Sequence, residues 1–226
     1  GIRNLGQSFL ERGIREANIC LTHTHWDHIN GFPFFTPAYV PDHDFEIRAG
    51  HLYDAGGVQR VLAGQMARPT FPVPLTALQA DIKFQDFQAG QQFEIEGIVV
   101  KTAPLQHPDG ATAYRIEADG RSFCYVTDTE HVPGEPDENV LGLIQGADLV
   151  VYDSTYTDAE FPKHVGWGHS TWQEGVRLCR RADVQRMAIF HHDPYHDDDF
   201  MDGVADEAKE AWEGAFVAVE GMQIDV

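Results

Sequence analysis

Four short apolar segments of this 226-residue chain each end abruptly in a histidine or an aspartate. They are Leu21-Thr22-His23, Val126-Thr127-Asp128, Val151-Tyr152-Asp153 and Ile189-Phe190-His191. Runs this short and apolar are typical of buried strands, and α/β folds place their chemistry where strands end. We therefore expect these polar residues to gather at one edge of a sheet.

Strands that alternate with helical segments indicate a mixed α/β fold, and a hairpin indicates that the sheet itself is mixed. Residues 113–117 and 122–127 flank Ala-Asp-Gly-Arg, a strong hairpin signal. Thr171 and Glu174 are spaced as a capping box for a helix over residues 170–181.

Other parts of the chain give weaker signals. Glycine, proline and aromatic residues predict a loop over residues 31–50, and residues 51–88 form the largest unassigned segment. Residues 217–219 and 222–226 are expected to close the chain as a strand pair. Without a repeat or a linker, residues 1–226 are expected to form a single domain.

The charge balance restricts the partners of the chain. Lysine and arginine number 16 against 36 aspartates and glutamates, a formal net charge of −20. Such a surface repels phosphate backbones and anionic lipids, which disfavours nucleic acid and membranes as partners. No apolar run approaches the roughly 20 residues of a transmembrane helix.

Cysteine usage points to a reducing compartment. The cysteines are Cys20, Cys124 and Cys179, and no two of them form a Cys-x-x-Cys pair. Their apolar surroundings predict small core residues rather than disulfides or thiolate ligands. We expect a cytoplasmic protein.

The residues after the first apolar strand offer the strongest chemical signal. Thr22-His23-Thr24-His25-Trp26-Asp27-His28 contains four metal-capable side chains. In a turn after a strand, His23 and His25 point one way, while Asp27 and His28 reach a second point nearby. One ion does not easily accept all four side chains, so the spacing favours two ions.

This His-x-His-x-Asp-His motif resembles the signature of the metallo-β-lactamase superfamily of binuclear metallohydrolases. The resemblance implies an αββα sandwich with mixed sheets. It also implies a third histidine for the first metal, which His107 matches, and a bridging carboxylate, which Asp128 matches. A late histidine completes the set; His191 is favoured, and His192 is the alternative.

By this resemblance, His23, His25 and His107 hold the first ion, and Asp27, His28 and His191 hold the second. Asp128 bridges the two ions. Nitrogen and oxygen ligands without thiolate suit Zn²⁺, with Mn²⁺ or Fe²⁺ as alternatives.

Two further motifs resemble the phosphodiesterase branch, which includes RNase Z and cyclic-phosphodiester hydrolases. Asp153-Ser154-Thr155 is similar to its acidic-x-Thr motif, and His169-Ser170-Thr171 to its His-Ser-Thr motif. The resemblance implies that His169 contacts the scissile phosphate or protonates the leaving oxygen, held by Asp153. Asp27, His169 and Asp153 are the expected catalytic residues, although RNase Z usually has glutamate in place of Asp153.

The start of the chain departs from the family pattern. Several strands normally precede the histidine motif, and here only 22 residues do. We expect the first N-terminal strands to be lacking, with an open sheet edge or an unfilled groove where they belong.

The expected activity is hydrolysis of a small or cyclic phosphodiester. One alternative is hydrolysis of a thioester, lactone or β-lactam at the same metals, and another is a non-catalytic regulatory module. The resemblance also allows a homodimer. RNase Z carries a Gly- and basic-rich arm for tRNA that is not evident here. The remaining histidines without an assigned partner, expected at the surface, are His43, His51, His131 and His164.

Overall fold

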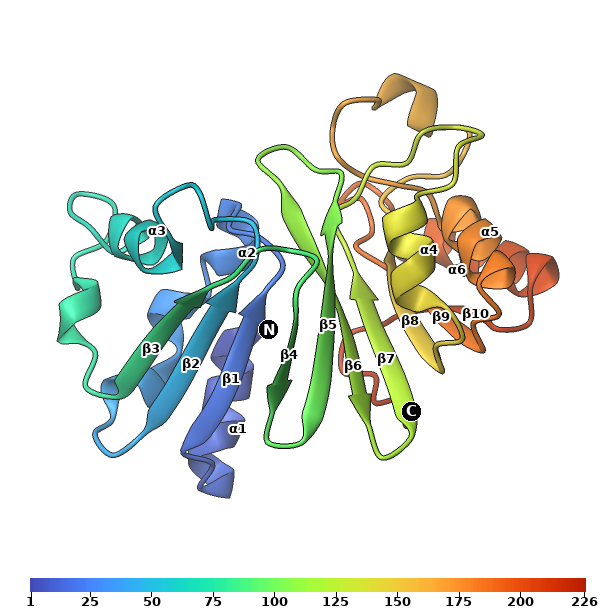
Figure 1. The fold of residues 1–226 in the computed structure, drawn as a ribbon. Helices are drawn as coiled ribbons and strands as arrows, with labels where there is room; N and C mark the ends of the chain where they lie inside the picture. Colours follow the sequence, from blue (N-terminus) through green and yellow to red (C-terminus); the bar gives the residue numbers. More distant parts are fainter. The chain divides into compact units, whose positions relative to one another are not determined.

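The computed structural model describes residues 1–226, and its internal contacts divide the chain into two compact units. One unit spans Gly1–Gln88 and the other Ala89–Val226. Each unit contains one sheet and several helices, so the mixed α/β class predicted from the sequence is confirmed (Figure 1).

The N-terminal unit is built on a three-stranded sheet in the order β1-β2-β3, with all pairs parallel. Its elements are α1 (Ile2–Arg12), β1 (Glu16–Leu21), α2 (Trp26–Ile29), η1 (Phe32–Phe34), η2 (Thr36–Tyr39), β2 (Asp44–Ala49), α3 (Val58–Gln65), η3 (Leu75–Ala77) and β3 (Asp81–Asp86). Leu21 pairs with Ala49, and Ala49 with Asp86, so the three strands end at the same edge.

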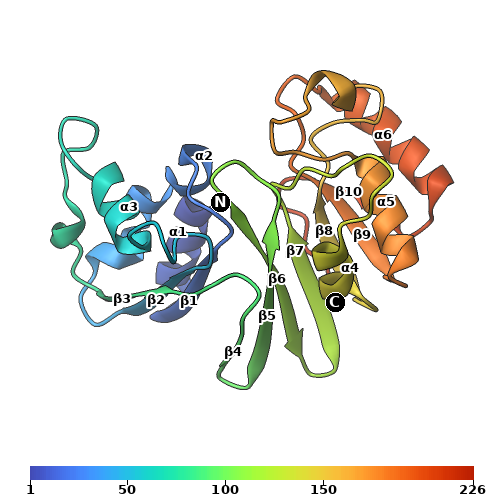
Figure 2. The ribbon, with the colours of Figure 1, turned by 45° about the horizontal axis from the view of Figure 1, so that its top comes forward.

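The core of this unit lies between the sheet and its helices. Ile47 and Ala49 of β2 are buried together with Val58 and Leu62 of α3, and Ile2 of α1 packs against them. Figure 2 shows α1 and α3 on the same side of the sheet. The helical layer therefore covers one face of the strands and fixes their shared edge.

The predicted loop over residues 31–50 is wrong at its end, and the unassigned segment 51–88 contains regular structure. Alternate residues of β2 are buried, which is the pattern of a strand with one covered face. β3 shows the same alternation more weakly, between half-buried and exposed residues. β2 pairs in parallel with β1, and β3 pairs in parallel with β2. Such long-range pairing leaves no turn signal in the sequence.

β1 forms an edge of its sheet, and its residues are half-buried or exposed. A cavity of about 360 Å³ lies along this strand, lined among others by Ile19 and Leu21 and by Ile2 near the chain start. The expectation that the first strands are lacking stays a prediction.

The C-terminal unit contains a seven-stranded mixed sheet in the order β10-β9-β8-β7-β6-β5-β4. Its elements are β4 (Gln92–Ile95), β5 (Ile98–Leu105), β6 (Ala111–Ala118), β7 (Arg121–Val126), α4 (Glu138–Ile144), β8 (Leu149–Asp153), η4 (Phe161–Lys163), α5 (Trp172–Arg181), β9 (Arg186–Phe190), α6 (Asp198–Ala211) and β10 (Ala215–Val217). Strands β7 to β10 pair in parallel, and β4 to β7 pair antiparallel.

The predicted hairpin and helix cap are both present in this unit. Asp119 and Gly120 join β6 to β7, and both have positive φ, 50° and 75°, as a two-residue type I′ turn requires. The Thr171 hydroxyl accepts a hydrogen bond from the Glu174 backbone N–H at the start of α5. The predicted final strand pair is wrong, because β10 overlaps its first strand only at Val217 and residues 222–226 form no strand.

One hydrophobic core holds the C-terminal unit together. Figure 1 shows α4, α5 and α6 grouped beside strands β7 to β10. Ile144 of α4, Leu178 of α5 and Ala208 of α6 are buried in one cluster with Val150 of β8 and Ile189 of β9. Packing on this scale fixes the strands, and therefore also the positions at which they end.

The three thiols behave as core residues, as the sequence predicted. Cys124 and Cys179 are buried and Cys20 is half-buried, and none is in a disulfide. Burial raises the pKa of the Cys20 thiol to about 11 and that of Cys124 to about 12, so these thiols stay protonated at neutral pH. No helix has both the length and the apolar character needed to span a bilayer.

Candidate active site

The His-x-His-x-Asp-His motif begins just after β1, with His23 and His25 in the turn that leads into the one-turn helix α2 and Asp27 and His28 in that helix. His23 is buried, and its Nε2 lies 3.1 Å from Nδ1 of His25. The ring centroids of His23 and His28 are 4.2 Å apart, and Nε2 of His28 lies 3.0 Å from a carboxylate oxygen of Asp27. One short turn therefore gathers the four ligands predicted in this unit.

The spacing of the His23 and His25 nitrogens fits a shared metal ion. Two nitrogens that each lie 2.0–2.1 Å from one tetrahedral zinc ion are about 3.3 Å apart. The observed separation is 3.1 Å, and the other ring nitrogen of His23 faces the Thr22 hydroxyl at 3.2 Å. A polar partner on the second ring nitrogen is usual for a metal-binding histidine.

His51 supports the motif from the neighbouring strand. It follows the end of β2, and its Nε2 lies 3.0 Å from the hydroxyl of Thr24, which separates His23 from His25. The sequence predicts a surface position for His51, but the residue is half-buried. The signal that identifies it is the pairing of β1 with β2, which places residues just beyond Leu21 next to residues just beyond Ala49.

Three predicted site residues lie at one edge of the C-terminal sheet. Asp128 follows β7, Asp153 ends β8 and His191 follows β9, and these three strands are parallel neighbours. Asp128 and His191 have φ of 62° and 64°, a left-handed conformation that residues with a side chain rarely adopt. Such backbone strain concentrates at functional sites, where the surrounding structure maintains it.

Asp128 and His191 face each other. The Oδ1 atom of Asp128, which is buried, lies 3.4 Å from Nε2 of His191. Nδ1 of His191 lies 3.0 Å from the hydroxyl of Thr155, and that hydroxyl also donates to Asp153 at 2.9 Å. A hydroxyl that donates its proton to a carboxylate accepts from Nδ1–H, which leaves the Nε2 lone pair of His191 directed at Asp128.

His192 has a different environment from its neighbour. Its Nε2 lies 3.2 Å from the Ala218 carbonyl, which only accepts, so the Nε2 atom carries the proton. Burial lowers the pKa of His192. Of the two late histidines left open by the sequence, the structure places His191 beside Asp128 and turns His192 toward backbone.

Asp153 and His169 form a hydrogen-bonded pair at the same edge. Asp153 is fully buried, and its Oδ2 lies 3.0 Å from Nδ1 of His169. The other donors to this carboxylate are the backbone N–H groups of Thr129, Thr155 and Ser170 and the Thr155 hydroxyl. The carboxylate therefore fixes the ring of His169, which stacks on that of His191 at 5.0 Å between centroids.

Asp128, Asp153, His169 and His191 form one compact group. Each offers a ligand atom within 4.8 Å of those of the others. Nitrogen and carboxylate oxygen donors of this kind, like those of the β1 turn, fit divalent metal ions. The seven predicted metal ligands divide between the units, with four in the N-terminal unit and three in the C-terminal unit.

His107, the remaining predicted ligand, follows β5 and is oriented by a distant backbone group. Its Nδ1 lies 2.7 Å from the carbonyl oxygen of Gly168, so Nδ1 carries the proton and Nε2 keeps its lone pair. Gly168 has φ of 85°, and a Cβ atom at this position would collide with the His107 ring. The His107 and His169 rings lie 5.3 Å apart between centroids.

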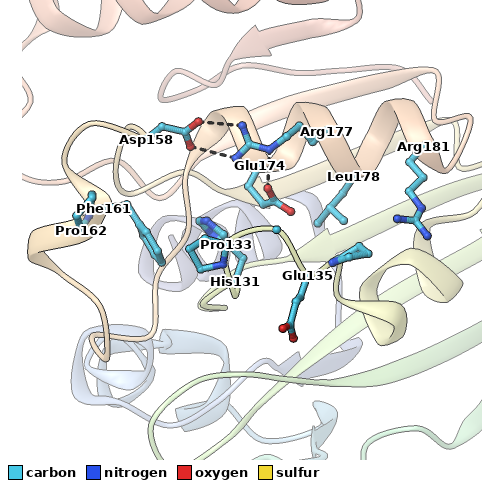
Figure 3. Close-up of a pocket in the computed structure, with 12 residues that line it drawn as sticks. His131, Pro133, Glu135, Asp158, Phe161, Pro162, Glu174, Arg177, Leu178 and Arg181 are labelled. Atoms are coloured by element: carbon cyan, nitrogen blue, oxygen red, sulfur yellow. Dashed lines mark hydrogen bonds and ion pairs between the residues drawn. The ribbon is translucent and has the colours of Figure 1, made fainter.

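A cavity of about 460 Å³ lies in the C-terminal unit, but none of the predicted metal ligands lines it (Figure 3). Arg177 points along one wall, where its guanidinium is held by Asp158 and Glu174. His131 lies on another wall, stacks on Phe161 and faces the Ser170 hydroxyl through Nδ1 at 2.8 Å. Because the predicted metal ligands lie elsewhere, we place the candidate site at the strand ends and not in this cavity.

The expectation that the unassigned histidines lie at the surface is wrong. His43 and His131 are buried, and His51 and His164 are half-buried. His164 stacks on Tyr156 at 4.1 Å between ring centroids, in the loop that leads to His169. The partners of His51 and His131, Thr24 and Ser170, lie far away along the chain, so sequence spacing alone does not reveal these two contacts.

Residues 10–192 match the beta-lactamase superfamily domain. A ribonuclease Z from Haloferax volcanii is 31% identical over 145 residues, which are 63% of this chain and 41% of the relative. A ribonuclease Z from Natronomonas pharaonis is 27% identical over 194 residues, 84% of this chain and 55% of the relative. This chain therefore spans about half or less of the length of these relatives.

Solved structures with less than 25% identity show the same fold. The metallo-beta-lactamase fold protein YhfI from Bacillus subtilis has a TM-score of 0.68 at 19% identity, covering 91% of this chain and 75% of that chain. Human tRNase Z, short form (ELAC1), has a TM-score of 0.65 at 20% identity, with coverages of 92% and 78%. A diphosphatase of the PhnP family has a TM-score of 0.68 at 18% identity, with coverages of 97% and 76%.

The family match covers most of the chain, and the fold agrees with it. The chain belongs to the beta-lactamase superfamily. The fold class expected from the His-x-His-x-Asp-His motif is confirmed, as is the likeness to ribonuclease Z and its relatives.

Proposed function

We propose that this chain is the catalytic domain of a metal-dependent phosphodiesterase that hydrolyses a small or cyclic phosphodiester. The pairing of His169 with the buried Asp153, beside Asp128 and His191, carries the proposal. A histidine held by a carboxylate next to metal-binding residues can give a proton to a departing alkoxide. Phosphodiester hydrolysis produces such a leaving group, and the curated relatives are named as nucleases of this kind.

The proposed metal centre follows the ligand order of the family motifs. His23, His25 and His107 would hold one divalent ion, Asp27, His28 and His191 the other, and Asp128 would bridge them. This assignment rests on the motif order and the family membership. We propose Zn²⁺ because every ligand is nitrogen or oxygen, with Mn²⁺ or Fe²⁺ as alternatives. Bound ions of this kind lower the pKa of water toward neutrality and neutralise charge that develops on phosphoryl oxygens.

The protein's own residues would orient the substrate and move the proton. Asp153 fixes His169 through Nδ1, which leaves Nε2 of His169 as the atom that faces a substrate oxygen. When His169 is protonated, the Asp153 carboxylate balances the imidazolium charge, as a buried acid does for a general acid–base histidine. His169 would thus protonate the leaving oxygen, and Asp153 would hold its ring in place.

RNA is a second candidate substrate, because the curated relatives are named ribonuclease Z. The net charge of −20 favours the small substrate, since the polyanionic RNA backbone is repelled at long range. Hydrolysis of a thioester, lactone or β-lactam is the other catalytic alternative. Such a hydrolysis does not need a general acid in addition to the metal ions, so it leaves the Asp153–His169 pair without a role.

Parallel assays separate these candidates. The protein is given Zn²⁺ or Mn²⁺ and assayed on bis(p-nitrophenyl) phosphate, a 2′,3′-cyclic nucleotide, a precursor tRNA, a simple ester and a β-lactam. We expect turnover of the first two substrates and its loss in His25→Ala, with Glu135→Gln as an active control. Activity on the ester or β-lactam alone contradicts the proposal. Salt-sensitive cleavage of precursor tRNA without cyclic nucleotide turnover favours RNA.

A further inference from the structure

Glu130 connects three loops at the edge of the C-terminal sheet where Asp128, Asp153 and His191 lie. Neither the sequence motifs nor the family likeness assigns Glu130 a role. It lies two residues after Asp128 and is half-buried. Its carboxylate accepts hydrogen bonds from the backbone N–H of Gly166, at 2.9 and 2.8 Å to its two oxygens, and from that of Gly168, at 2.8 Å. Hydrogen bonds to an ionised acceptor are roughly twice as strong as neutral ones.

The backbone of Glu130 makes a further contact, to the turn that follows β5. Its N–H donates to the carbonyl oxygen of Gln106 at 2.7 Å, and Gln106 directly precedes His107. Nδ1 of His107 in turn donates to the carbonyl oxygen of Gly168 at 2.7 Å. Glu130, Gln106, His107 and Gly168 therefore form a closed ring of contacts around the turn after β5 and the loop before α5.

This ring restrains a long connection. Residues 154–171 join β8 to α5 and contain only the short η4 turn as regular structure. Gly166 and Gly168 have φ of 89° and 85°, a backbone conformation that glycine adopts readily and residues with a side chain rarely adopt. In this conformation, the Gly166 and Gly168 N–H groups donate hydrogen bonds to the Glu130 carboxylate. The Gly168 carbonyl oxygen accepts a hydrogen bond from Nδ1–H of His107.

We propose that Glu130 is a positioning residue that sets the orientation and tautomer of His107 through Gly168. The inference rests on the proposed function, because His107 is a ligand in the metal centre proposed above. By holding Gly168, Glu130 keeps the Gly168 carbonyl on Nδ1–H of His107, so that the lone pair of His107 is on Nε2, the atom that would bind a divalent ion. The same restraint places His169, the next residue after Gly168.

The first test measures metal binding by Glu130→Gln and Glu130→Ala. Binding of Zn²⁺ is followed by competition with a chromophoric chelator, and the fold is checked by circular dichroism. Outer partners of metal-binding histidines typically contribute about 10–100-fold in affinity. We expect roughly tenfold weaker binding of one ion in Glu130→Gln, a larger loss in Glu130→Ala, and little change for the other ion. Glu135→Gln, an exposed carboxylate on the same loop, is the matched control.

The second test needs no metal and separates this inference from the proposed function. Long-range ¹H–¹⁵N spectra of the metal-free protein report which nitrogen of His107 carries the proton. We expect Nδ1–H in the wild type and a mixture of tautomers in Glu130→Gln. If the wild type binds no ion, the proposed function fails, and the tautomer shift alone decides the role of Glu130. Unchanged His107 signals and unchanged metal affinity in a folded Glu130→Gln variant overturn the inference.

Discussion

His191 and His192 are adjacent in the chain, yet their rings meet different partners. His191 faces Asp128 through Nε2, with its Nδ1 on the Thr155 hydroxyl. His192 donates through Nε2 to the Ala218 carbonyl. The left-handed conformation of His191 ends β9 and turns the two rings apart. Only the first ring has a nitrogen lone pair directed at another predicted ligand.

Replacing each histidine by glutamine tests this difference. We expect His191→Gln to weaken binding of one divalent ion by more than about 100-fold, because losing a ligand costs more than losing an outer partner. His192→Gln should keep the wild-type metal content. Chelator competition and elemental analysis measure both effects. Metal loss in His192→Gln with retention in His191→Gln reverses the assignment.

The Asp153 carboxylate has two roles, because its two oxygens accept hydrogen bonds from buried donors and its negative charge faces His169. Its carboxylate accepts from the backbone N–H groups of Thr129, Thr155 and Ser170 as well as facing His169. An asparagine amide offers one oxygen, so at least one buried donor loses its acceptor. Leaving such a donor unpaired costs about 1–3 kcal/mol.

We therefore expect Asp153→Asn to lower the free energy of unfolding by about 1–3 kcal/mol, as measured by urea denaturation. Asp119→Asn, at the exposed hairpin turn, is the control and should change little. Phosphodiester turnover should also fall in Asp153→Asn, because His169 loses its negatively charged partner. Wild-type stability together with wild-type turnover contradicts the role given to Asp153.

At the scale of elements, the sequence predicts features that local chemistry determines. The Asp119-Gly120 turn and the Thr171 cap depend on residues that are close in sequence, and both form as predicted. β2 was missed because glycine and proline nearby suggested a loop and the alternation of its buried residues is short. β3 lies in the segment that was left unassigned. Their parallel partners are distant in the chain, so only packing reveals them.

The candidate site also has parts that the sequence predicts and parts that it does not. Strand ends marked by histidine or aspartate allowed Asp128, Asp153 and His191 to be grouped from the sequence, and the parallel register brings them together. The supporting contacts were not predictable. Glu130 meets Gly166 and Gly168 across more than thirty residues of chain, through a loop with no periodic pattern.

The hairpin turn gives a stability prediction for one element. Gly120 has φ of 75°, which alanine tolerates poorly, and Gly120→Ala should destabilise the protein by about 1 kcal/mol. Gly142 lies within helix α4 with open space around it, so Gly142→Ala should stabilise by about 0.5–1 kcal/mol. Thermal denaturation of the two variants checks the signs. Equal shifts in the same direction contradict the turn assignment.

For the whole molecule, His131 links pH to stability. It is buried, and burial lowers its pKa below the ordinary 6.5, against smaller opposing effects of the Glu174, Asp158 and Glu130 carboxylates. As pH falls through 6.5, the unfolded chain takes up a proton that folded His131 resists. Stability is therefore complete above that pH and declines below it.

Thermal denaturation of the metal-free protein between pH 8 and pH 5 tests this linkage. Other histidines also titrate, so the useful quantity is the difference between the wild type and His131→Gln. We expect the variant to lose less stability than the wild type as pH falls. A parallel pair of pH profiles shows that His131 does not contribute.

For the molecule as an enzyme, we propose above that the Asp153–His169 pair protonates the leaving group of a phosphodiester. The leaving group decides how much this proton matters. A p-nitrophenolate departs readily without protonation, whereas the alkoxide released from a 2′,3′-cyclic nucleotide does not. General acid catalysis contributes about 10²–10⁴-fold where it is needed.

The most direct measurement is therefore kcat for wild type and His169→Ala on bis(p-nitrophenyl) phosphate and on a 2′,3′-cyclic nucleotide, at equal metal occupancy. The account predicts a loss of about 10²–10⁴-fold on the cyclic nucleotide and a much smaller loss on the activated diester. Equal losses on both substrates, or no loss on either, would contradict it.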